Sequence, residues 1–543
     1  MLPIRLATAA LLVPALASAQ AVGPVLDSVF APWRATGGPG CTVGVDFAGV
    51  RTLRAYGMAN LEAGLALEPE SVLETGSVAK QFTAAAVALL AQEDRLALDD
   101  DIRKYLPEVP DFGKRITIRH LLHHTSGLRD QWALLGLQGF PPGQEVHTFA
   151  RILDLVARQQ RLNFDPGAEY LYSNTGFALA AIIVQRVSRQ SFAEFSRERF
   201  FKPLGMLRTE WRDDYRKVVP GRAVAYTRAP GGWLQDMPFT MVHGNGGLLT
   251  TVGDLLTWNR ALSDSSVPGG GALVRELETT GRLNDGAPIH YALGLSIDAF
   301  RGVRTVEHGG ATAGYRTQLT RWPDRHLSVA ILCNAAQANP AGMADRIAIR
   351  LLDLPAEAAP PAPAQPLERD LADRLAGSYR DSVVDQTLTV SAAPDGGLAV
   401  RSAGPGARLT YLGNLRFWAP GPGELRFEQV GDHWEIVQFA EAWRRYRPEP
   451  PIDRTTVRNA DYLGEYRSPE LDVTYRLVDD NGQLVLLARP DDRLTLIPAY
   501  RDGFLAAGRS VRFIRDRRGT VTGLRIFAGR ARDVRFERVP GGR

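Results

Sequence analysis

Residues 76–83 of the chain read Gly-Ser-Val-Ala-Lys-Gln-Phe-Thr. Apolar side chains recur from here at steps of three and four residues, at Val78, Phe82, Ala85 and Leu89. The spacing predicts a helix that begins at or near Ser77. Ser77 would then lie at the positive end of the helix, where unpaired backbone N–H groups can stabilise an oxyanion. Lys80 would lie three residues on, against the same face.

A serine and a lysine in this arrangement can act as a nucleophile and its base. A buried lysine loses solvation, its pKa falls, and its amine can take the proton of the serine hydroxyl. The alternative is a serine N-cap followed by a surface lysine. Ser77 and Lys80 are therefore candidate catalytic residues, and motifs elsewhere in the chain must decide between the two interpretations.

A second motif, Tyr172-Ser173-Asn174, follows a Phe-Asp-Pro-Gly turn at residues 164–167 and precedes an apolar helix predicted over residues 177–187. At a loop tip, a phenol and a carboxamide can project into a cleft. The Tyr172 phenol can relay a proton to a leaving group, and the Asn174 amide can hold both the substrate and the lysine. N-capping and packing are the alternative account of these residues.

A third motif opens a predicted strand with His308, Gly309 and Gly310. Glycines there let a substrate backbone approach the strand edge. The N–H of Ala311 would be a second oxyanion donor, alongside that of Ser77. His308 is either a polar residue of the cleft or a simple turn residue. Taken together, the three motifs predict acyl transfer through Ser77.

With their flanking residues, these motifs resemble those of the serine β-lactamase-like, penicillin-recognising hydrolases. This family includes class C β-lactamases, D,D-carboxypeptidases, family VIII esterases and D-aminopeptidases. Further similar segments are His-Leu-Leu-His-His-Thr-Ser-Gly-Leu at residues 120–128, Pro-Leu-Gly-Met at 203–206 and Gly-Gly-Leu-Leu-Thr-Thr at 246–251. The resemblance covers about residues 24–354. It implies an α+β catalytic domain with an antiparallel five-stranded sheet covered by helices, a helical subdomain, and the site between them.

The resemblance also implies a role for each residue of the motifs. The implied catalytic residues are Ser77 as the acylated nucleophile, Lys80 as its general base and Tyr172 as the proton shuttle. The implied substrate-binding residues are Asn174, His308, Gly309, Gly310 and Ala311. His308 departs from the β-lactamase pattern, because it stands where those enzymes usually carry the Lys of Lys-Thr-Gly. The ammonium and the Thr hydroxyl that bind a β-lactam carboxylate are both absent.

The expected function is therefore that of an exported serine hydrolase acting through an acyl-enzyme. Its expected substrates are small molecules or peptides: esters, amides or D-amino-acid peptides, with peptidoglycan-derived peptides among them. Arg316 is a candidate substitute for binding a carboxylate, and a strand-surface arginine is the simpler account of it. Two alternative functions remain: a slow peptidoglycan-binding, penicillin-binding protein with little turnover, and a β-lactamase proper.

The composition of the chain changes after the catalytic region. A chain of 543 residues that is 45% hydrophobic has room for about three domains. Five prolines in residues 355–366 predict a stiff linker that ends a catalytic domain of residues 24–354. Beyond it, short alternating strands with repeated motifs predict two copies of one small antiparallel β-module, over residues 367–447 and 453–540.

These modules resemble the two lipocalin-like barrels that family D-aminopeptidases carry behind the catalytic domain. If the resemblance extends that far, a loop from the tail enters the cleft and restricts substrates to those with a free amino terminus. This hypothesis assigns a function to a region whose sequence shows no chemistry of its own.

Residues 1–19 predict a cleaved signal peptide, with a positive Arg5, an apolar stretch over residues 6–16 and Ala-Ser-Ala at 17–19. The mature protein is expected to be periplasmic or secreted. No later run reaches the roughly 18 apolar residues of a spanning helix, so no membrane span is predicted. A net charge of +4, with arginines spread along the chain, does not indicate nucleic-acid binding.

The two cysteines, Cys41 and Cys333, each end an alternating apolar run and are expected to face a core from strands. Buried free thiols are the expectation, and a disulfide is the alternative if the two strands are neighbours. His123 and His124 have no third ligand at metal spacing, so no metal and no cofactor are assigned. Residues 131–147, rich in Gly and Pro, form either a lid or a plain loop.

Overall fold

The computed structural model describes residues 22–34, 37–140, 143, 145–356, 365–393, 396–402, 406–419, 423–439, 443–450, 452–489 and 492–541. The predicted signal peptide lies outside the described residues, as does most of the predicted linker. The chain forms two compact units. Unit 1 comprises Met1–Ser126, Pro142–Val156 and Ser173–Ala358, and unit 2 comprises Gly127–Pro141, Ala157–Tyr172 and Ala359–Arg543.

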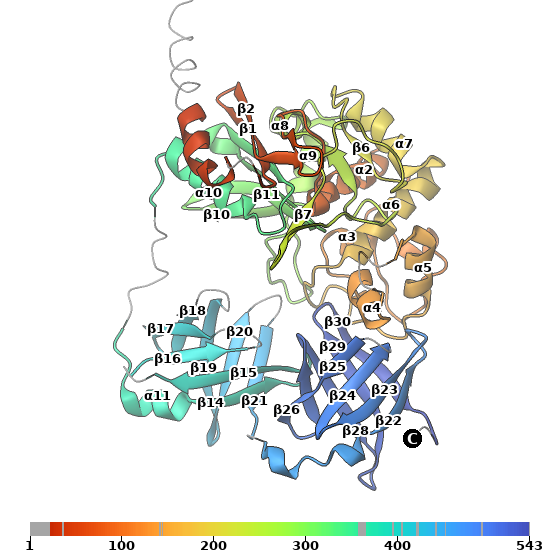
Figure 1. Ribbon diagram of the computed structural model, residues 1–543, viewed down its shortest axis with the longest axis vertical. Coiled ribbons are helices and arrows are strands. Elements are labelled where there is room, and N and C mark those ends of the chain that lie inside the picture. The colour runs from red at the N-terminus through yellow and green to blue at the C-terminus, as the bar shows by residue number, and fades with distance from the viewer. Residues whose placement is uncertain are drawn as a thin grey trace, which may run out of the picture. The chain divides into compact units, whose positions relative to one another are not determined.

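The described part of unit 1 is built on a six-stranded antiparallel sheet in the order β10-β11-β12-β13-β1-β2. Figure 1 labels four of these strands, β1, β2, β10 and β11. Its strands are β1 Cys41–Phe47, β2 Val50–Tyr56, β10 Ser296–Phe300, β11 Val303–Thr312, β12 Tyr315–Trp322 and β13 Leu327–Cys333. The predicted antiparallel sheet is confirmed, but the predicted number of five strands is wrong. The sheet has a sixth strand because Arg301 and Gly302, with φ of 52° and 80°, form a two-residue turn that folds β10 back onto β11.

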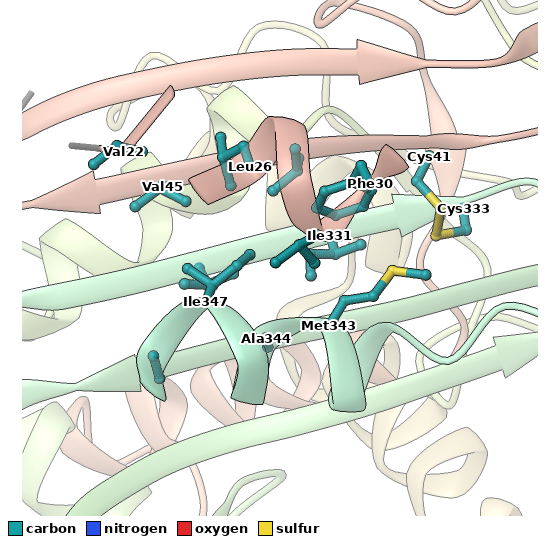
Figure 2. Close-up of a cluster of buried hydrophobic side chains, with 14 of the residues drawn as sticks. Val22, Leu26, Phe30, Cys41, Val45, Ile331, Cys333, Met343, Ala344 and Ile347 are labelled. Carbon is teal, nitrogen blue, oxygen red and sulfur yellow. A yellow bond between two sulfur atoms is a disulfide. The ribbon is translucent and has the colours of Figure 1, made fainter. Parts of the chain in front are cut away.

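Helices cover both faces of this sheet. One face carries a helix over residues 22–29 together with α10 (Pro340–Leu351), and Figure 2 shows both beside β1 and β13. The core between them contains the fully buried side chains of Leu26, Phe30, Ile331 and Ile347. Side chains alternate along β1, so Gly44 faces the other way. There it meets α8 (Val252–Ser263) so closely that an added Cβ would lie 2.9 Å from Leu256.

The two cysteines form a disulfide, Cys41–Cys333. The strands β1 and β13 are antiparallel neighbours, and their register places Cys41 opposite Cys333 with 4.0 Å between the Cα atoms. Both side chains are buried in the core, as predicted (Figure 2). The expectation of free thiols is wrong, because bonding depended on which strands pair, and this pairing joins residues 292 positions apart.

Further α-helices of unit 1 lie outside this core. They are α2 Lys80–Gln92, α3 Ile118–Leu122, α5 Phe149–Ala157, α6 Asn174–Ser188, α7 Phe192–Ser196 and α9 Gly270–Glu278. α2 packs against α6, and every residue of α2 from Lys80 to Leu90 is buried. A helix enclosed on all sides needs small and apolar residues all round, which explains its run of alanines. Among the described residues, no helix has the length and apolar character needed to cross a membrane.

Short strands complete unit 1. β3 Met58–Asn60 pairs with β4 Leu65–Ala66, β7 Tyr226–Ala229 pairs with β8 Gly232–Gln235, and β9 Leu248–Thr250 lies between β5 Leu73–Glu74 and β6 Glu210–Trp211. The sheet of β5, β9 and β6 matters for the site, because β5 leads directly into the turn that carries Ser77. Glu74, at the end of β5, forms a fully buried bidentate ion pair with Arg212 at 2.8 Å.

Unit 2 contains two antiparallel β-modules, as predicted. In the first, eight strands close into a barrel: β14 Gly377–Asp381, β15 Gln386–Ala392, β16 Leu398–Arg401, β17 Ala407–Gly413, β18 Arg416–Ala419, β19 Gly423–Val430, β20 His433–Phe439 and β21 Trp443–Pro448. A short helix, α11 (Arg369–Leu375), precedes it. The helix and the barrel share one hydrophobic core.

In the second module, nine strands form one antiparallel sheet in the order β25-β24-β23-β22-β30-β29-β28-β27-β26. They are β22 Gly464–Ser468, β23 Val473–Asp480, β24 Gln483–Arg489, β25 Asp492–Thr495, β26 Ile497–Tyr500, β27 Gly503–Ala506, β28 Arg509–Arg515, β29 Val521–Ala528 and β30 Ala531–Arg538. Only Leu496 separates the two edge strands β25 and β26. The sheet therefore curves until its edges meet, in the manner of a barrel.

The two modules repeat one another down to single side-chain contacts. Tyr379 in β14 donates its hydroxyl hydrogen to the carbonyl four residues earlier at 2.9 Å, and Tyr466 in β22 does the same at 2.8 Å. The ring of Tyr379 meets Phe427 edge-to-face with 5.9 Å between centroids, and Tyr466 meets Phe513 at the same 5.9 Å. The internal repeat in the sequence thus corresponds to one structural unit used twice.

Two segments that precede the linker in the sequence belong to unit 2. The first contains helix α4 (Gln131–Leu137), so part of the predicted lid or loop is a helix. Next to it, the fully buried Arg129 forms an ion pair with Glu470 of the second module at 2.7 Å. Burial lowers the pKa of Arg129 and raises that of Glu470, so each charge depends on the other.

Candidate active site

Ser77 lies in a turn of 3-10 helix, η2 (Gly76–Ala79), that continues directly into α2. The predicted helix is therefore present, with a 3-10 turn as its first part. Ser77 is partly exposed, whereas its neighbours Gly76 and Val78 are buried. Gly76 has a φ of 53°, and a Cβ on it would lie 2.6 Å from the backbone nitrogen of Ala311. Only glycine fits this position, which brings the serine turn against β11.

Lys80 is fully buried and lies directly beside the serine. Its Nζ is 3.0 Å from Ser77 Oγ, 2.9 Å from Asn174 Oδ1 and 2.6 Å from the carbonyl oxygen of Asn245. The two oxygens from the asparagines can only accept hydrogen bonds, whereas a hydroxyl can also donate. A neutral amine can donate its two hydrogens to those two acceptors and direct its lone pair to the Ser77 hydroxyl. This geometry suits a general base for the Ser77 proton.

Asn174 is brought to Lys80 by the start of α6, of which it is the first residue. Ser173, in an extended conformation, precedes the helix, and its backbone N–H donates to Nδ1 of His124 at 3.1 Å. The ring of His124 packs against Phe177, one turn into the same helix, with 5.2 Å between centroids. The Asn174 side chain is 7% exposed, so few other positions are open to it.

The strand β11 approaches the serine turn at Gly310 and Ala311. A Cβ on Gly310 would lie 1.9 Å from the carbonyl oxygen of Thr75 and 3.1 Å from the Ser77 nitrogen. The backbone nitrogens of Ser77 and Ala311 therefore lie on adjacent stretches of chain, as an oxyanion hole requires. Gly309 is less crowded, because a Cβ there would lie 3.0 Å from the end of the Gln318 side chain and 3.8 Å from the Thr317 carbonyl oxygen.

His308 is buried, and both of its ring nitrogens have partners. Nδ1 is 2.6 Å from the carbonyl oxygen of Gly309, and Nε2 is 2.9 Å from the hydroxyl of Tyr291. Burial, and secondly the positive charge of Lys80, lower the pKa of His308 to about 4. At neutral pH the imidazole is therefore uncharged, and the position carries no cation.

Tyr172 belongs to unit 2, two residues before the Asn174 of unit 1. The guanidinium carbon of Arg530, in the turn between β29 and β30, lies 4.7 Å from the centroid of its ring. The backbone of Arg530 is held by two hydrogen bonds. Its carbonyl accepts from Asp130 N–H at 3.2 Å and from Asn163 Nδ2 at 2.9 Å. The catalytic role of Tyr172 stays a prediction from the sequence.

Other polar residues named from the sequence lie in structural positions. Nη1 of Arg316 donates to the carbonyls of Ala313 and Tyr315 in its own hairpin, at 2.6 and 2.7 Å. His123 Nδ1 lies 3.2 Å from the carbonyl of Tyr291. In the described part of the chain, no group of three or more His, Cys, Asp or Glu side chains is arranged to bind a metal ion.

Sequence reasoning missed three residues of this site. Asn245 contributes through its backbone carbonyl, which leaves no signature in the side-chain pattern. Tyr291 was not named from the sequence, and His124 was considered only as a metal ligand. Only the fold brings their rings together, with 4.6 Å between centroids. The Gly-rich stretch at residues 244–247 was a usable signal, since closely packed backbone often marks a site.

The chain is similar to known proteins over most of its length. The model of a family described as Beta-lactamase matches residues 30–354. A D-aminopeptidase of Brucella anthropi is 28% identical over 531 residues, which cover 92% of this chain and 96% of that protein. A D-aminopeptidase of Brucella suis biovar 1 is 27% identical over 529 residues, with the same coverage of each chain.

Solved structures share the fold. The octameric penicillin-binding protein homologue from Pyrococcus abyssi has a TM-score of 0.53 and 21% identity, covering 88% of this chain and 99% of that one. The D-amino acid amidase from Ochrobactrum anthropi SV3, complexed with L-phenylalanine amide, has a TM-score of 0.53 and 20% identity. It covers 62% of this chain and 99% of its own.

Proposed function

The chain belongs to the Beta-lactamase family and is a serine hydrolase, and on this basis we propose that it is exported and hydrolyses D-amino-acid amides and peptides or related esters through an acyl-enzyme on Ser77. One observation carries the proposal: Lys80 Nζ lies 3.0 Å from Ser77 Oγ, and it also contacts Asn174 Oδ1 and the Asn245 carbonyl, which can only accept. The Lys80 amine is therefore placed to take the proton of the Ser77 hydroxyl as that oxygen attacks the substrate.

The reaction then has two halves. In the first, the Ser77 hydroxyl passes its proton to Lys80 while Oγ bonds to the substrate carbonyl carbon. The resulting oxyanion accepts hydrogen bonds from the N–H groups of Ser77 and Ala311. The carbon–nitrogen or carbon–oxygen bond breaks, and the leaving group takes the proton through Tyr172. In the second half, water attacks the acyl-enzyme by the same route in reverse, and Ser77 regains its proton.

The preference for D-amino-acid substrates rests on the relatives and on His308. The D-aminopeptidase of Brucella anthropi aligns over nearly the whole of both chains, so the β-modules are shared as well as the catalytic region. His308 is neutral at pH 7, because burial holds its pKa at about 4. A β-lactam carboxylate would meet no cation there, which disfavours the β-lactamase alternative.

Export is supported by the sequence of residues 1–19 and by the Cys41–Cys333 disulfide, since disulfides persist in oxidising compartments such as the periplasm. Amino-terminal sequencing of the protein recovered from the periplasm or medium should begin near Gln20. An intact amino terminus in the cytosolic fraction would refute this part of the proposal.

The central test is steady-state hydrolysis by the wild type and by Ser77→Ala. Three chromogenic substrates separate the alternatives: a D-alanyl nitroanilide, a short-chain nitrophenyl ester and a cephalosporin. We expect turnover of the anilide and the ester, and a loss in Ser77→Ala of about 10⁴-fold or more. The exposed Ser266 provides the matched control, because Ser266→Ala should leave turnover unchanged.

Each alternative predicts a different result in this assay. A slow penicillin-binding protein would release one equivalent of chromophore and stop. A β-lactamase would hydrolyse the cephalosporin fastest. Activity that survives Ser77→Ala would refute Ser77 as the nucleophile.

We further propose that the second β-module restricts the substrate through Arg530. The support is the position of the Arg530 guanidinium over the ring of Tyr172, together with the family resemblance of the tail. We expect Arg530→Ala to change relative kcat/KM for free and N-acetylated D-alanyl anilides by at least about tenfold. Arg518→Ala, in the exposed β28–β29 turn of the same module, should not. Equal ratios in Arg530→Ala and the wild type would refute the restriction.

A further inference from the structure

Tyr291 lies between α9 and β10 and is 4% exposed. Its hydroxyl donates to Nε2 of His308 at 2.9 Å, and its ring lies 4.6 Å from that of His124. Its backbone carbonyl accepts from Nδ1 of His123 at 3.2 Å. One side chain thus contacts a residue of β11 and a residue that supports the start of α6.

The contact with His308 selects one form of that histidine. The Gly309 carbonyl, 2.6 Å from Nδ1, can only accept, so Nδ1 carries the hydrogen. In the neutral ring Nε2 is then the acceptor, and the Tyr291 hydroxyl supplies the donor it needs. With both nitrogens engaged, the ring of His308 can neither flip nor rotate without losing two hydrogen bonds.

The contact with His124 links Tyr291 to the residues that orient Lys80. The ring of His124 lies against Tyr291, and its Nδ1 accepts the backbone N–H of Ser173 at 3.1 Å. Ser173 immediately precedes Asn174, whose side chain binds Lys80. A shift of the Tyr291 ring would therefore reach the residues that orient the base.

The segment that carries Tyr291 has little freedom to move. Gly294, three residues on, has a φ of 72°, and a Cβ there would lie 2.8 Å from backbone atoms of Lys80 and Gln81. The segment therefore lies directly against the start of α2, beside the catalytic pair. This tight packing restricts the movement of Tyr291, so Tyr291 can hold the side chains that contact it in place.

We propose that Tyr291 is a positioning residue, which fixes the ring of His308 beside the oxyanion strand and, through His124, the Ser173–Asn174 turn that orients Lys80. The inference rests on the proposed function, because it takes Ser77 as the nucleophile. Tyr291 itself contacts no reacting atom. It acts through His308 and His124, so its removal should matter only while those partners are present.

The test compares Tyr291→Phe, Tyr291→Leu and the control Tyr56→Phe on the anilide substrate. Tyr56, the last residue of β2, is also a buried tyrosine of unit 1, and its hydroxyl donates to Asp27 at 2.9 Å. We expect Tyr291→Phe to lower kcat/KM by about 3- to 10-fold, as for one lost hydrogen bond. Tyr291→Leu, which also removes the ring, should lower kcat/KM further. The kcat/KM of Tyr56→Phe should equal that of the wild type.

A double-mutant cycle tests whether Tyr291 acts through His308. In a His308→Gln background, the additional change Tyr291→Phe should have little effect on kcat/KM. A full 3- to 10-fold loss in that background would overturn the proposal, as would an unchanged kcat/KM in Tyr291→Phe alone.

A measurement on the wild type is independent of activity. In ¹⁵N-histidine spectra, with His308 identified by its absence in His308→Gln, we expect the Nδ1–H form between pH 5 and 8. In Tyr291→Phe, water reaches Nε2, and titration should appear within that range together with a new acidic limb in kcat/KM. An Nε2–H form in the wild type would overturn the inference. If the wild type has no turnover, the proposed function fails, and these spectra still test the Tyr291–His308 contact.

Discussion

Buried histidines make the stability of this fold depend on pH, and His243 is an example. Burial lowers the pKa of His243 to about 4, from an ordinary value of 6.5. Its ring lies 4.7 Å from that of Phe149, and its Nδ1 is 2.9 Å from the carbonyl of Met241. Two residues later, the carbonyl of Asn245 binds Lys80, so this aromatic packing supports the loop that helps to orient the base.

Acid should therefore destabilise unit 1 through His243. Because its folded pKa lies below the unfolded value, its contribution is complete above about pH 7. The contribution is lost as the pH falls from 6.5 toward 4, and about 2 kcal/mol is gone by pH 5. The thermal unfolding midpoint of the wild type should fall between pH 7.5 and 5.0, and that of His243→Gln should fall less.

The control for this prediction is His290→Gln, since His290 is exposed. It should retain the full acid-induced decrease of the wild type. An equal decrease in His243→Gln and the wild type would show that His243 does not contribute to the pH dependence.

Among the elements, the contact between β11 and the serine turn is the closest. Two glycines permit it, Gly76 on the turn and Gly310 on the strand, and each lies where a Cβ would meet the backbone of the other element. The buried Glu74–Arg212 ion pair fixes the strand that enters the turn. The oxyanion donors are thus set by backbone packing between two elements that lie more than 200 residues apart in the sequence.

Adding a methyl group at Gly310 should separate these elements. A Cβ there would lie 1.9 Å from the Thr75 carbonyl, so Gly310→Ala must displace β11 from Ser77. We expect a loss in kcat/KM of about 100-fold, which is the cost of a displacement near 1 Å. The Cβ in Gly309→Ala would lie 3.0 Å from the Gln318 side chain and 3.8 Å from the nearest backbone atom of β12, so this variant should lose much less kcat/KM. Similar losses in both variants would contradict this account.

In the whole molecule, the boundary of the compact units does not follow the linear sequence. Residues 127–141 and 157–172 precede the predicted linker, yet they form part of unit 2. Their buried polar groups have partners in the second β-module: Arg129 pairs with Glu470, and Gln138 donates to the carbonyl of Leu471 at 2.6 Å. A polar group buried with its partner is stable, and the same group without the partner is costly.

A chain ended after Leu354 should therefore be less stable or insoluble, because it lacks the partners that the second β-module gives to Arg129 and Gln138. In the full chain, Glu470→Gln leaves the Arg129 charge buried and should cost about 3–5 kcal/mol. The double variant Arg129→Met, Glu470→Leu removes both charges and should recover much of that loss. The thermal unfolding midpoints of the truncated chain, Glu470→Gln and the double variant, each compared with the wild type, measure these losses of stability. A truncated protein with the unfolding midpoint of unit 1 in the full chain would contradict the prediction.

The features that depend on local spacing could be predicted from the residue pattern. The helix after Ser77, the strands that end in Cys41 and Cys333 and the repeated β-module all follow from periodicity over a few residues. The motif residues Ser77, Lys80 and Asn174 could be named in advance because a side chain of defined chemistry stands at each position. The structure brings these three within hydrogen-bonding distance of one another through Lys80.

Contacts between distant segments could be known only from the folded chain. The disulfide required β1 and β13 to be neighbours, and the sixth strand of the sheet required β10 to fold back onto β11. Asn245 contributes a carbonyl that every residue possesses, so no residue pattern could reveal it. Tyr291 acquires its place only when packing sets its hydroxyl against His308. Local patterns fix local conformation, whereas such contacts depend on burial and register across the whole fold.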